Sequence, residues 1–206
     1  PNSSKACWWL RLRGDAHGLC MSQELSPQGF ALLADFFEAQ SGIQLRPEKR
    51  LMVAGRLMRR AQIMGCTLDE YARRVVARPQ DPEAVILTDL LTTNETYFFR
   101  EPQHFQHLAN TVRNATGSAP LRVWSAAASS GEEAYSIALT LARYAGTRPW
   151  EVVGTDLSTR VVAQARTGLY AEERCANIPM EDRKRWCLKG QGAYEGTVLM
   201  NRDLRA

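Results

Sequence analysis

Residues 121–136 read LRVWSAAASSGEEAYS, and residues 150–156 read WEVVGTD. The first stretch changes from a strand-like run over 121–126 to five small residues over 127–131, and then to a helix with apolar residues at helical spacing. The second stretch predicts a short strand over 150–155, which is followed by Asp156. This order predicts the first half of a doubly wound parallel sheet of the nucleotide-binding kind: a strand, a small-residue turn, a helix, a second strand and an acid.

The turn differs from the glycine-rich G-x-G-x-x-G pattern, and it places Glu132 and Glu133 where a pyrophosphate would lie. Asp156 follows Gly131 by 25 residues, near the spacing of about 20 for an acid that binds two ribose hydroxyls. The two glutamates could simply complement the helix dipole. The alternative is a ligand with a ribose, a cationic head and no phosphate. S-adenosylmethionine, with its sulfonium and α-ammonium groups, fits that description, whereas a dinucleotide does not.

The first half of the chain predicts a small domain of four short helices. A cap residue or a proline marks most of their starts. The first helix runs from Ser26-Pro27 to Gly42, the second from about Pro47 to Met64, the third from Thr67 with a capping box to Glu70, and the fourth from Asp81-Pro82. We expect Met21 to be the natural start, with residues 1–20 an upstream extension, and a helical domain over residues 21–92.

Positive charge is concentrated in this half. Residues 46–78 hold nine basic and three acidic side chains, a net charge of +6 against +4 for the whole chain. Arg56, Arg59 and Arg60 are spaced to share one helix face. This stripe is either a solvated face or a docking surface for an acidic partner. Because no aromatic residues are interleaved with it, nucleic acid is a weaker partner than an acidic protein helix.

Composition excludes several classes of protein. With 45% hydrophobic and 23% charged residues, the 206-residue chain is an ordinary globular one and not disordered, collagen-like or coiled-coil. No stretch approaches the roughly 20 apolar residues of a membrane-spanning helix, so we expect no direct membrane insertion. The five cysteines form no C-x-x-C pair and the three histidines have no zinc-ligand spacing, which predicts free thiols in a reducing cytoplasm and no metal.

Residues 91–101, LTTNETYFFRE, together with residues 123–136, closely resemble the CheR family of chemotaxis-receptor glutamate O-methyltransferases. GTDLS at residues 154–158 and ARTGLY at residues 165–170 continue the resemblance, which extends from Leu25 to the end of the chain. It implies an α/β fold in which the small N-terminal helical domain precedes a doubly wound, Rossmann-like methyltransferase domain over residues 93–206. A small antiparallel β-subdomain is expected at about residues 183–202, with candidate strands over 185–188 and 197–200.

The family continues with further sheet strands beyond the point that corresponds to Ala206. We therefore expect the methyltransferase domain and its cofactor pocket to be incomplete in these 206 residues. Activity is an expectation for the family rather than for this stretch alone.

The resemblance implies that the cofactor is S-adenosylmethionine, released as S-adenosylhomocysteine, with no metal. Asn94, Thr96 and Arg100 would line the cofactor and the active site, Glu133 would bind the cofactor's amino group, and Asp156 would bind its ribose. Arg100 is the candidate catalytic residue, as the group that orients the substrate carboxylate; a salt bridge to its neighbour Glu101 is the alternative. Arg56 and Arg59 become candidate receptor-docking residues, although Gln62 departs from a position that is often basic.

A glutamate carboxylate is ionised near pH 7, since its ordinary pKa is about 4.3, so methyl transfer to it needs no general base. The implied partner is the cytoplasmic helical domain of chemoreceptors, and binding of a receptor C-terminal peptide at the β-subdomain stays open. We expect a cytoplasmic monomer that is recruited to membrane receptor arrays and binds no nucleic acid. The alternatives are a non-catalytic receptor-binding or regulatory module and a nucleic-acid methyltransferase.

Overall fold

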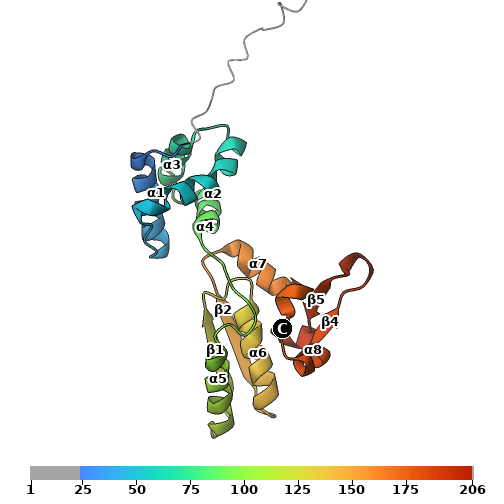
Figure 1. The fold of residues 1–206 in the computed structure, drawn as a ribbon. Coiled ribbons are helices and arrows are strands. Elements are labelled where there is room, and N and C mark those ends of the chain that lie inside the picture. Colours follow the sequence, from blue (N-terminus) through green and yellow to red (C-terminus); the bar gives the residue numbers. More distant parts are fainter. Residues whose placement is uncertain (1–23, 206) are drawn as a thin grey trace, which may run out of the picture. The chain divides into compact units, whose positions relative to one another are not determined.

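The computed structural model describes residues 24–205, which form two compact units that divide between Pro79 and Gln80 (Figure 1). The expectations for Met21 and for residues 1–20 lie outside the described residues.

The first unit is helical. It contains α1 (Pro27–Ser41), the 3-10 turn η1 (Pro47–Lys49), α2 (Arg50–Ile63) and α3 (Leu68–Val76). Its core is built on side chains that are at most 1% exposed: Leu33, Phe37, Leu57 and Tyr71. The predicted helices are confirmed to within about three residues, and the second begins as the 3-10 turn.

The predicted capping signals explain where these helices begin and end. The Ser26 hydroxyl accepts the Gly29 N–H, and Gly42 ends α1 with a φ of 71°. At the start of α3, Thr67 and Glu70 each accept the other's backbone N–H, at 3.2 and 2.9 Å respectively. The bond from the Thr67 N–H favours the ionised carboxylate and lowers the pKa of Glu70 below its ordinary value.

The helix α4 (Pro82–Leu91) opens the second unit. It packs against α7 (Thr159–Thr167), where the Thr159 hydroxyl donates to Asp89 Oδ2 at 3.2 Å. The compact units therefore divide the chain before α4, earlier than the domain boundary predicted between residues 92 and 93.

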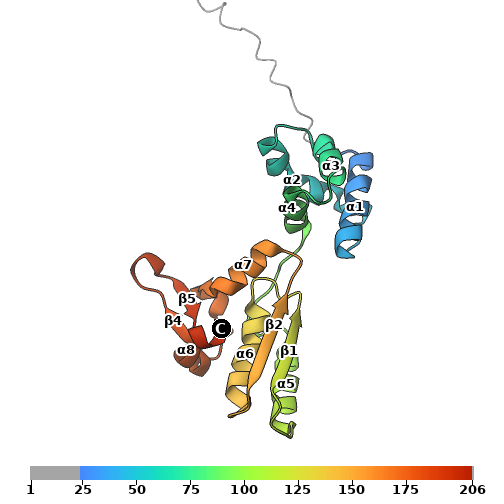
Figure 2. The same cartoon turned by 180° about the vertical axis from the view of Figure 1, so that it is seen from behind.

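A parallel pair of strands forms the centre of the second unit. β1 (Leu121–Ala126) pairs with β2 (Trp150–Thr155) in a register that places Val123 opposite Val152. The helix α6 (Glu132–Tyr144) connects them and packs on one face of the pair together with α5 (Pro102–Asn114). Seen from behind in Figure 2, β1 and β2 lie side by side in front of α6. Along the chain, the order of strand, helix and parallel strand is the βαβ unit that the sequence predicted.

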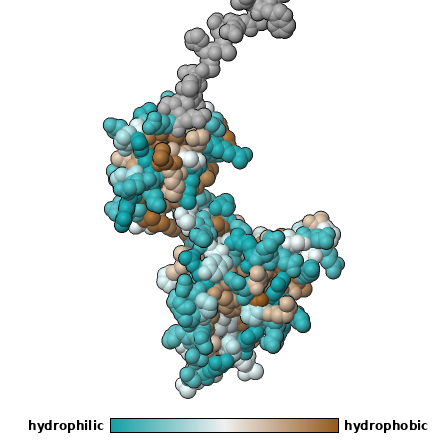
Figure 3. All heavy atoms as spheres, viewed as in Figure 1, coloured by the Kyte–Doolittle hydropathy of each residue, from teal (hydrophilic) through white to brown (hydrophobic). Residues whose placement is uncertain are grey.

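The two faces of this strand pair differ. Val123 and Val152 pack with Leu141 beneath α6, whereas Trp124 and Val153 point the other way and are 68% and 47% exposed. On the side drawn in Figure 3, the surface of the second unit is predominantly hydrophilic.

The C-terminal part of the second unit contains a small antiparallel sheet. Its order is β3-β5-β4, built from β3 (Leu169–Ala171), β4 (Cys187–Lys189) and β5 (Thr197–Met200). The connecting elements are η2 (Glu172–Cys175), α8 (Met180–Trp186) and η3 (Gly192–Tyr194), and α9 (Arg202–Arg205) follows the sheet. The helical unit, the parallel pair and this sheet confirm the predicted fold class.

Two predicted details of this sheet are wrong. The strand expected over 185–188 begins only at Cys187, because Arg185 and Trp186 complete the last turn of α8. The sheet also recruits residues 169–171, well before the expected start at about residue 183, since β3 pairs with β5. A three-residue strand is too short to show a period of two in the sequence.

Within the described residues, no helix combines the length and the apolar character needed to cross a bilayer.

Candidate functional site

The turn between β1 and α6 has the backbone shape of a glycine-rich loop without most of the glycines. Ala127, Ser129 and Gly131 adopt left-handed φ values of 62°, 49° and 97°. Glycine is the residue that takes this conformation most easily, so the two non-glycine residues are strained. A Cβ atom at Gly131 would lie 2.8 Å from the Ala165 Cβ and 2.8 Å from the Tyr170 hydroxyl oxygen. Position 131 therefore requires a glycine, both because of its φ and because a Cβ atom there would lie too close to these two residues.

Asp156 lies at the carboxyl end of β2 and is held by two backbone groups. Its Oδ2 accepts the Ser129 N–H at 2.8 Å, and its Oδ1 accepts the Ser158 N–H at 2.9 Å. These bonds join the ends of β1 and β2 and fix the plane of the carboxylate. Each oxygen of a carboxylate has more than one acceptor site, so Asp156 can still accept hydrogen bonds from ligand hydroxyls.

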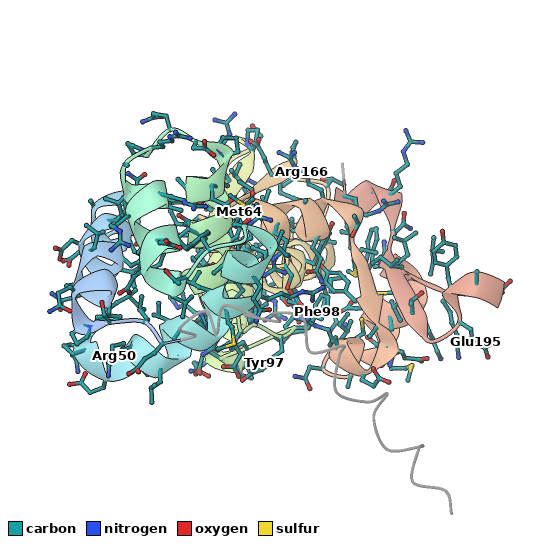
Figure 4. The ribbon with its side chains drawn as sticks, turned by 90° about the horizontal axis from the view of Figure 1, so that it is seen from above. Arg50, Met64, Tyr97, Phe98, Arg166 and Glu195 are labelled. Atoms are coloured by element: carbon teal, nitrogen blue, oxygen red, sulfur yellow. The ribbon has the colours of Figure 1, made fainter. Side chains whose placement is uncertain are left out.

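The segment 92–101 is anchored against this turn. The Ser129 hydroxyl donates to the Asn94 carbonyl at 3.0 Å, and the Phe99 N–H donates to the Ser136 hydroxyl of α6 at 2.9 Å. Phe98 is fully buried, whereas its neighbour Tyr97 is 43% exposed; both are labelled in Figure 4. The segment therefore holds Asn94 beside the strand ends.

Arg100 makes its contacts within its own segment. Its Nη1 donates to the Glu95 carbonyl at 3.0 Å, and its guanidinium lies 5.9 Å from the centre of the Tyr97 ring. The Glu101 carboxylate instead accepts a hydrogen bond from the Gln103 amide at 2.7 Å. The alternative of an Arg100–Glu101 salt bridge is therefore not realised in the described part of the chain. The Arg100 side chain stays exposed.

The two glutamates at the start of α6 have different surroundings. Glu133 is exposed, and its Oε1 accepts a hydrogen bond from the Ser125 hydroxyl at the end of β1, at 2.7 Å. Glu132 is 0% exposed and forms an ion pair with Arg174 of η2. Since a buried carboxylate is costly without a partner, the dipole of α6 alone does not account for Glu132.

The ion pair between Arg174 and Glu132 is the contact that the sequence did not predict. Besides Glu132, it reaches the Thr96 carbonyl at 3.3 Å and the Ser130 hydroxyl at 3.4 Å. The two neighbouring acids in residues 131–133 could have indicated that one of them, if buried, needs a cation as a partner. Nothing in the spacing, however, selects Arg174 from the other arginines.

The structure thus brings Asn94, Thr96, Glu133 and Asp156 to the carboxyl ends of the parallel strands, which is where ligands bind in open α/β sheets. Two carboxylates beside a turn of small side chains suit a ligand with hydroxyl and ammonium groups, so the residues present fit S-adenosylmethionine. A separate cavity of about 470 Å³ borders Ser129 and Gly131 from the α7 side, but it is lined by neither carboxylate, and we do not place the cofactor there.

The two predicted docking residues belong to the other unit. Arg59 is exposed and Arg56 is half-buried on α2, whose opposite side packs into the helical core through Val53 and Leu57. Across residues 24–205 there is no cluster of three or more histidine, cysteine or acidic side chains that could hold a metal ion.

Comparison with known proteins agrees with both units. A family model described as "CheR methyltransferase, all-alpha domain" matches residues 28–92, and one described as "CheR methyltransferase, SAM binding domain" matches residues 94–205. The chain belongs to the CheR methyltransferase family.

Individual relatives carry matching names. A chemotaxis protein methyltransferase of Escherichia coli K12 is 39% identical over 183 residues, which are 87% of this chain and 63% of the relative. One of Salmonella typhimurium is 38% identical, with the same two shares. The chemotaxis protein methyltransferase 2 of Pseudomonas aeruginosa is 39% identical over 80% of this chain and 60% of its own length. The chain therefore spans less than two thirds of the length of these relatives.

Proposed function

We propose that this chain belongs to an enzyme that transfers a methyl group from S-adenosylmethionine to glutamate side chains of chemoreceptors. The observation that carries the proposal is the Asp156 carboxylate, fixed by the Ser129 and Ser158 amides at the strand ends. Family membership and the names of the relatives support the same reaction class. The reaction would take place in the cytoplasm, at membrane receptor arrays.

The cofactor would lie across the ends of β1 and β2. Asp156 would accept hydrogen bonds from the two ribose hydroxyls, and Glu133 would bind the ammonium group from the first turn of α6. Asn94 and Thr96 would form the wall contributed by the segment 92–101. When bound, S-adenosylmethionine supplies the methyl group of its sulfonium and leaves as the neutral thioether S-adenosylhomocysteine.

The protein has little proton chemistry to do in such a transfer. The attacking glutamate oxygen is already ionised near pH 7, so the new O–CH₃ bond forms as the S–CH₃ bond breaks, with no proton transfer. Catalysis would come from in-line placement and exclusion of water. Arg100 would orient the substrate carboxylate; a very tight grip would stabilise the charged reactant more than the less charged transition state.

The receptor would dock on the helical unit. Arg59 and Arg56 on α2 would face the acidic surface of the cytoplasmic helical domain of a chemoreceptor. A second contact is available in the small sheet, where β4 is an edge strand with Leu188 55% exposed and Lys189 beside it. An extended receptor C-terminal peptide could add there as a further strand.

A methyl-transfer assay tests the proposal. With labelled S-adenosylmethionine and a purified chemoreceptor cytoplasmic domain, we expect label in the receptor that is released by mild alkali, as carboxyl methyl esters are. Replacement of Asp156 by Asn should abolish most of the transfer, and the same change at Asp35, an exposed residue of α1, should not. Alkali-stable label would exclude esterification, and cofactor binding without transfer would favour a non-catalytic receptor-binding module.

A further inference from the structure

Arg174 joins three segments that meet at the candidate cofactor site. Its Nη2 donates to the Thr96 carbonyl of the segment 92–101 and to the Ser130 hydroxyl of the turn, and it pairs with the Glu132 carboxylate at the start of α6. Arg174 itself belongs to η2, directly after β3 of the small antiparallel sheet. One guanidinium thus connects the small sheet to the segment 92–101 and to the turn between β1 and α6.

A second chain of hydrogen bonds closes a ring through Glu132. The Ser136 hydroxyl donates to the Glu132 carbonyl at 2.6 Å and accepts the Phe99 N–H at 2.9 Å. The segment 92–101 is therefore attached to α6 at Phe99 and, through Arg174, at Thr96. Arg100 follows one of these attachment points directly, and Asn94 precedes the other by two residues.

The electrostatics explain why the guanidinium stays in place. Glu132 is fully buried, and its second oxygen accepts a hydrogen bond from the Ser130 hydroxyl at 2.7 Å. Loss of Arg174 would leave this carboxylate buried without a countercharge, which is strongly unfavourable. The Arg174 side chain, in contrast, is 41% exposed, so solvent still reaches part of it.

We propose that Arg174 is a positioning residue for the methyl-transfer site. It fixes the spacing between Thr96 and the turn, and thereby the spacing between Asn94 and the carboxylates of Glu133 and Asp156. Its effect on cofactor binding rests on the function proposed above, whereas its hold on the segment 92–101 is a property of the free protein. An arginine suits this task because its planar fork offers several donors in fixed directions, which a lysine ammonium does not.

Removing the charge of Arg174 alone, and then together with that of Glu132, distinguishes a positioning role from a contribution to stability. Arg174→Met should lower the melting temperature and weaken S-adenosylhomocysteine binding by roughly tenfold or more, because small displacements in a site are expensive. The double variant Arg174→Met/Glu132→Gln leaves no buried charge, so its melting temperature should recover most of the loss. Its affinity should stay low, because the Thr96 carbonyl still lacks its donor. If both the melting temperature and the affinity for S-adenosylhomocysteine recover in the double variant, Arg174 only neutralises Glu132. That result would overturn the proposal.

Hydrogen exchange of the free protein gives a readout that needs no cofactor. The Phe99 and Ser129 amides should exchange faster in both Arg174 variants than in the parent chain. The matched control is Arg183→Met, which removes an ion pair between α8 and Glu172 at 3.1 Å and should leave these two amides unchanged. Unchanged exchange in the Arg174 variants would overturn the proposal. If both amides exchange faster in the Arg174 variants but the parent chain binds no S-adenosylhomocysteine, the positioning role is upheld and the proposed function is contradicted instead.

Discussion

At the scale of single residues, the site depends on carboxylates that the backbone holds in place. Both oxygens of Asp156 accept backbone N–H groups, and one oxygen of Glu133 accepts a serine hydroxyl. Orientation is therefore set before any ligand arrives, which lowers the entropy lost on binding.

Replacing Asp156 by Ala should weaken S-adenosylhomocysteine binding by roughly 10- to 100-fold, because each hydrogen bond to a charged acceptor is worth about 1.5–3 kcal/mol. Isothermal titration calorimetry measures the effect. Asp35→Ala, at an exposed position of α1, is the control and should bind like the parent. Equal affinity of the Asp156 variant and the parent would remove Asp156 from the site.

A buried thiol in η2, which packs on the small sheet, gives a prediction about pH. Burial raises the pKa of Cys175 from 9.0 to about 11, with a further contribution from nearby Cys187. Because the thiolate is the reactive form, Cys175 should resist iodoacetamide from pH 7 to 9 and react faster only as the pH approaches 11. Mass spectrometry of the alkylated chain follows the reaction. Alkylation at pH 8 as fast as in urea-unfolded protein would contradict the buried placement.

At the scale of elements, the turn from β1 to α6 decides how close a ligand can come to the strand ends. Its left-handed residues alternate at 127, 129 and 131, and only the last is a glycine. The strain at Ala127 and Ser129 is offset by the bonds that tie the turn to β2, among them the Ala128 N–H to the Thr155 carbonyl at 2.9 Å.

Substitution of two glycines that have positive φ distinguishes the cost of backbone strain from the cost of steric crowding. Gly146, after α6, has a φ of 61° and open space around its Cβ position, so Gly146→Ala should cost only about 1 kcal/mol of unfolding free energy. Gly131→Ala adds overlap with Ala165 and Tyr170 to the same backbone strain and should cost about 1–3 kcal/mol more. Urea unfolding of the two variants makes the comparison. Equal losses would mean that the turn is less tightly packed than described.

The elements also show where sequence reasoning works. The strands 121–126 and 150–155 were predicted to the residue, because small or turn-forming residues bound both apolar runs. α5 was missed, although Pro102 stands at its first position. The pairing of β3 with β5 joins residues 26 to 30 positions apart, and the contact between Arg174 and Glu132 joins residues 42 positions apart. Only tertiary packing creates such contacts, and no local period encodes them.

At the scale of the whole molecule, the two units divide the proposed work. The helical unit carries the excess positive charge, and the second unit carries the carboxylates of the cofactor site. Substrate docking and cofactor binding should therefore respond to different substitutions.

Charge reversal at the docking face tests this division. Arg56→Glu/Arg59→Glu should raise the apparent KM for the receptor domain, because like charges then face each other, and the increase should shrink at high salt. The affinity for S-adenosylhomocysteine should not change. Arg78→Glu is the control, because Arg78 is an exposed arginine of the same unit that follows α3 and does not lie on α2. Unaltered turnover at low receptor concentration would show that the receptor docks elsewhere.

The most direct measurement is the difference density of a crystal soaked with S-adenosylhomocysteine. We predict density across the ends of β1 and β2, with the two ribose hydroxyls within hydrogen-bonding distance of Asp156 and the amino group beside Glu133. A product molecule bound at a different place, or flat density next to these two carboxylates at a saturating concentration, would contradict the account.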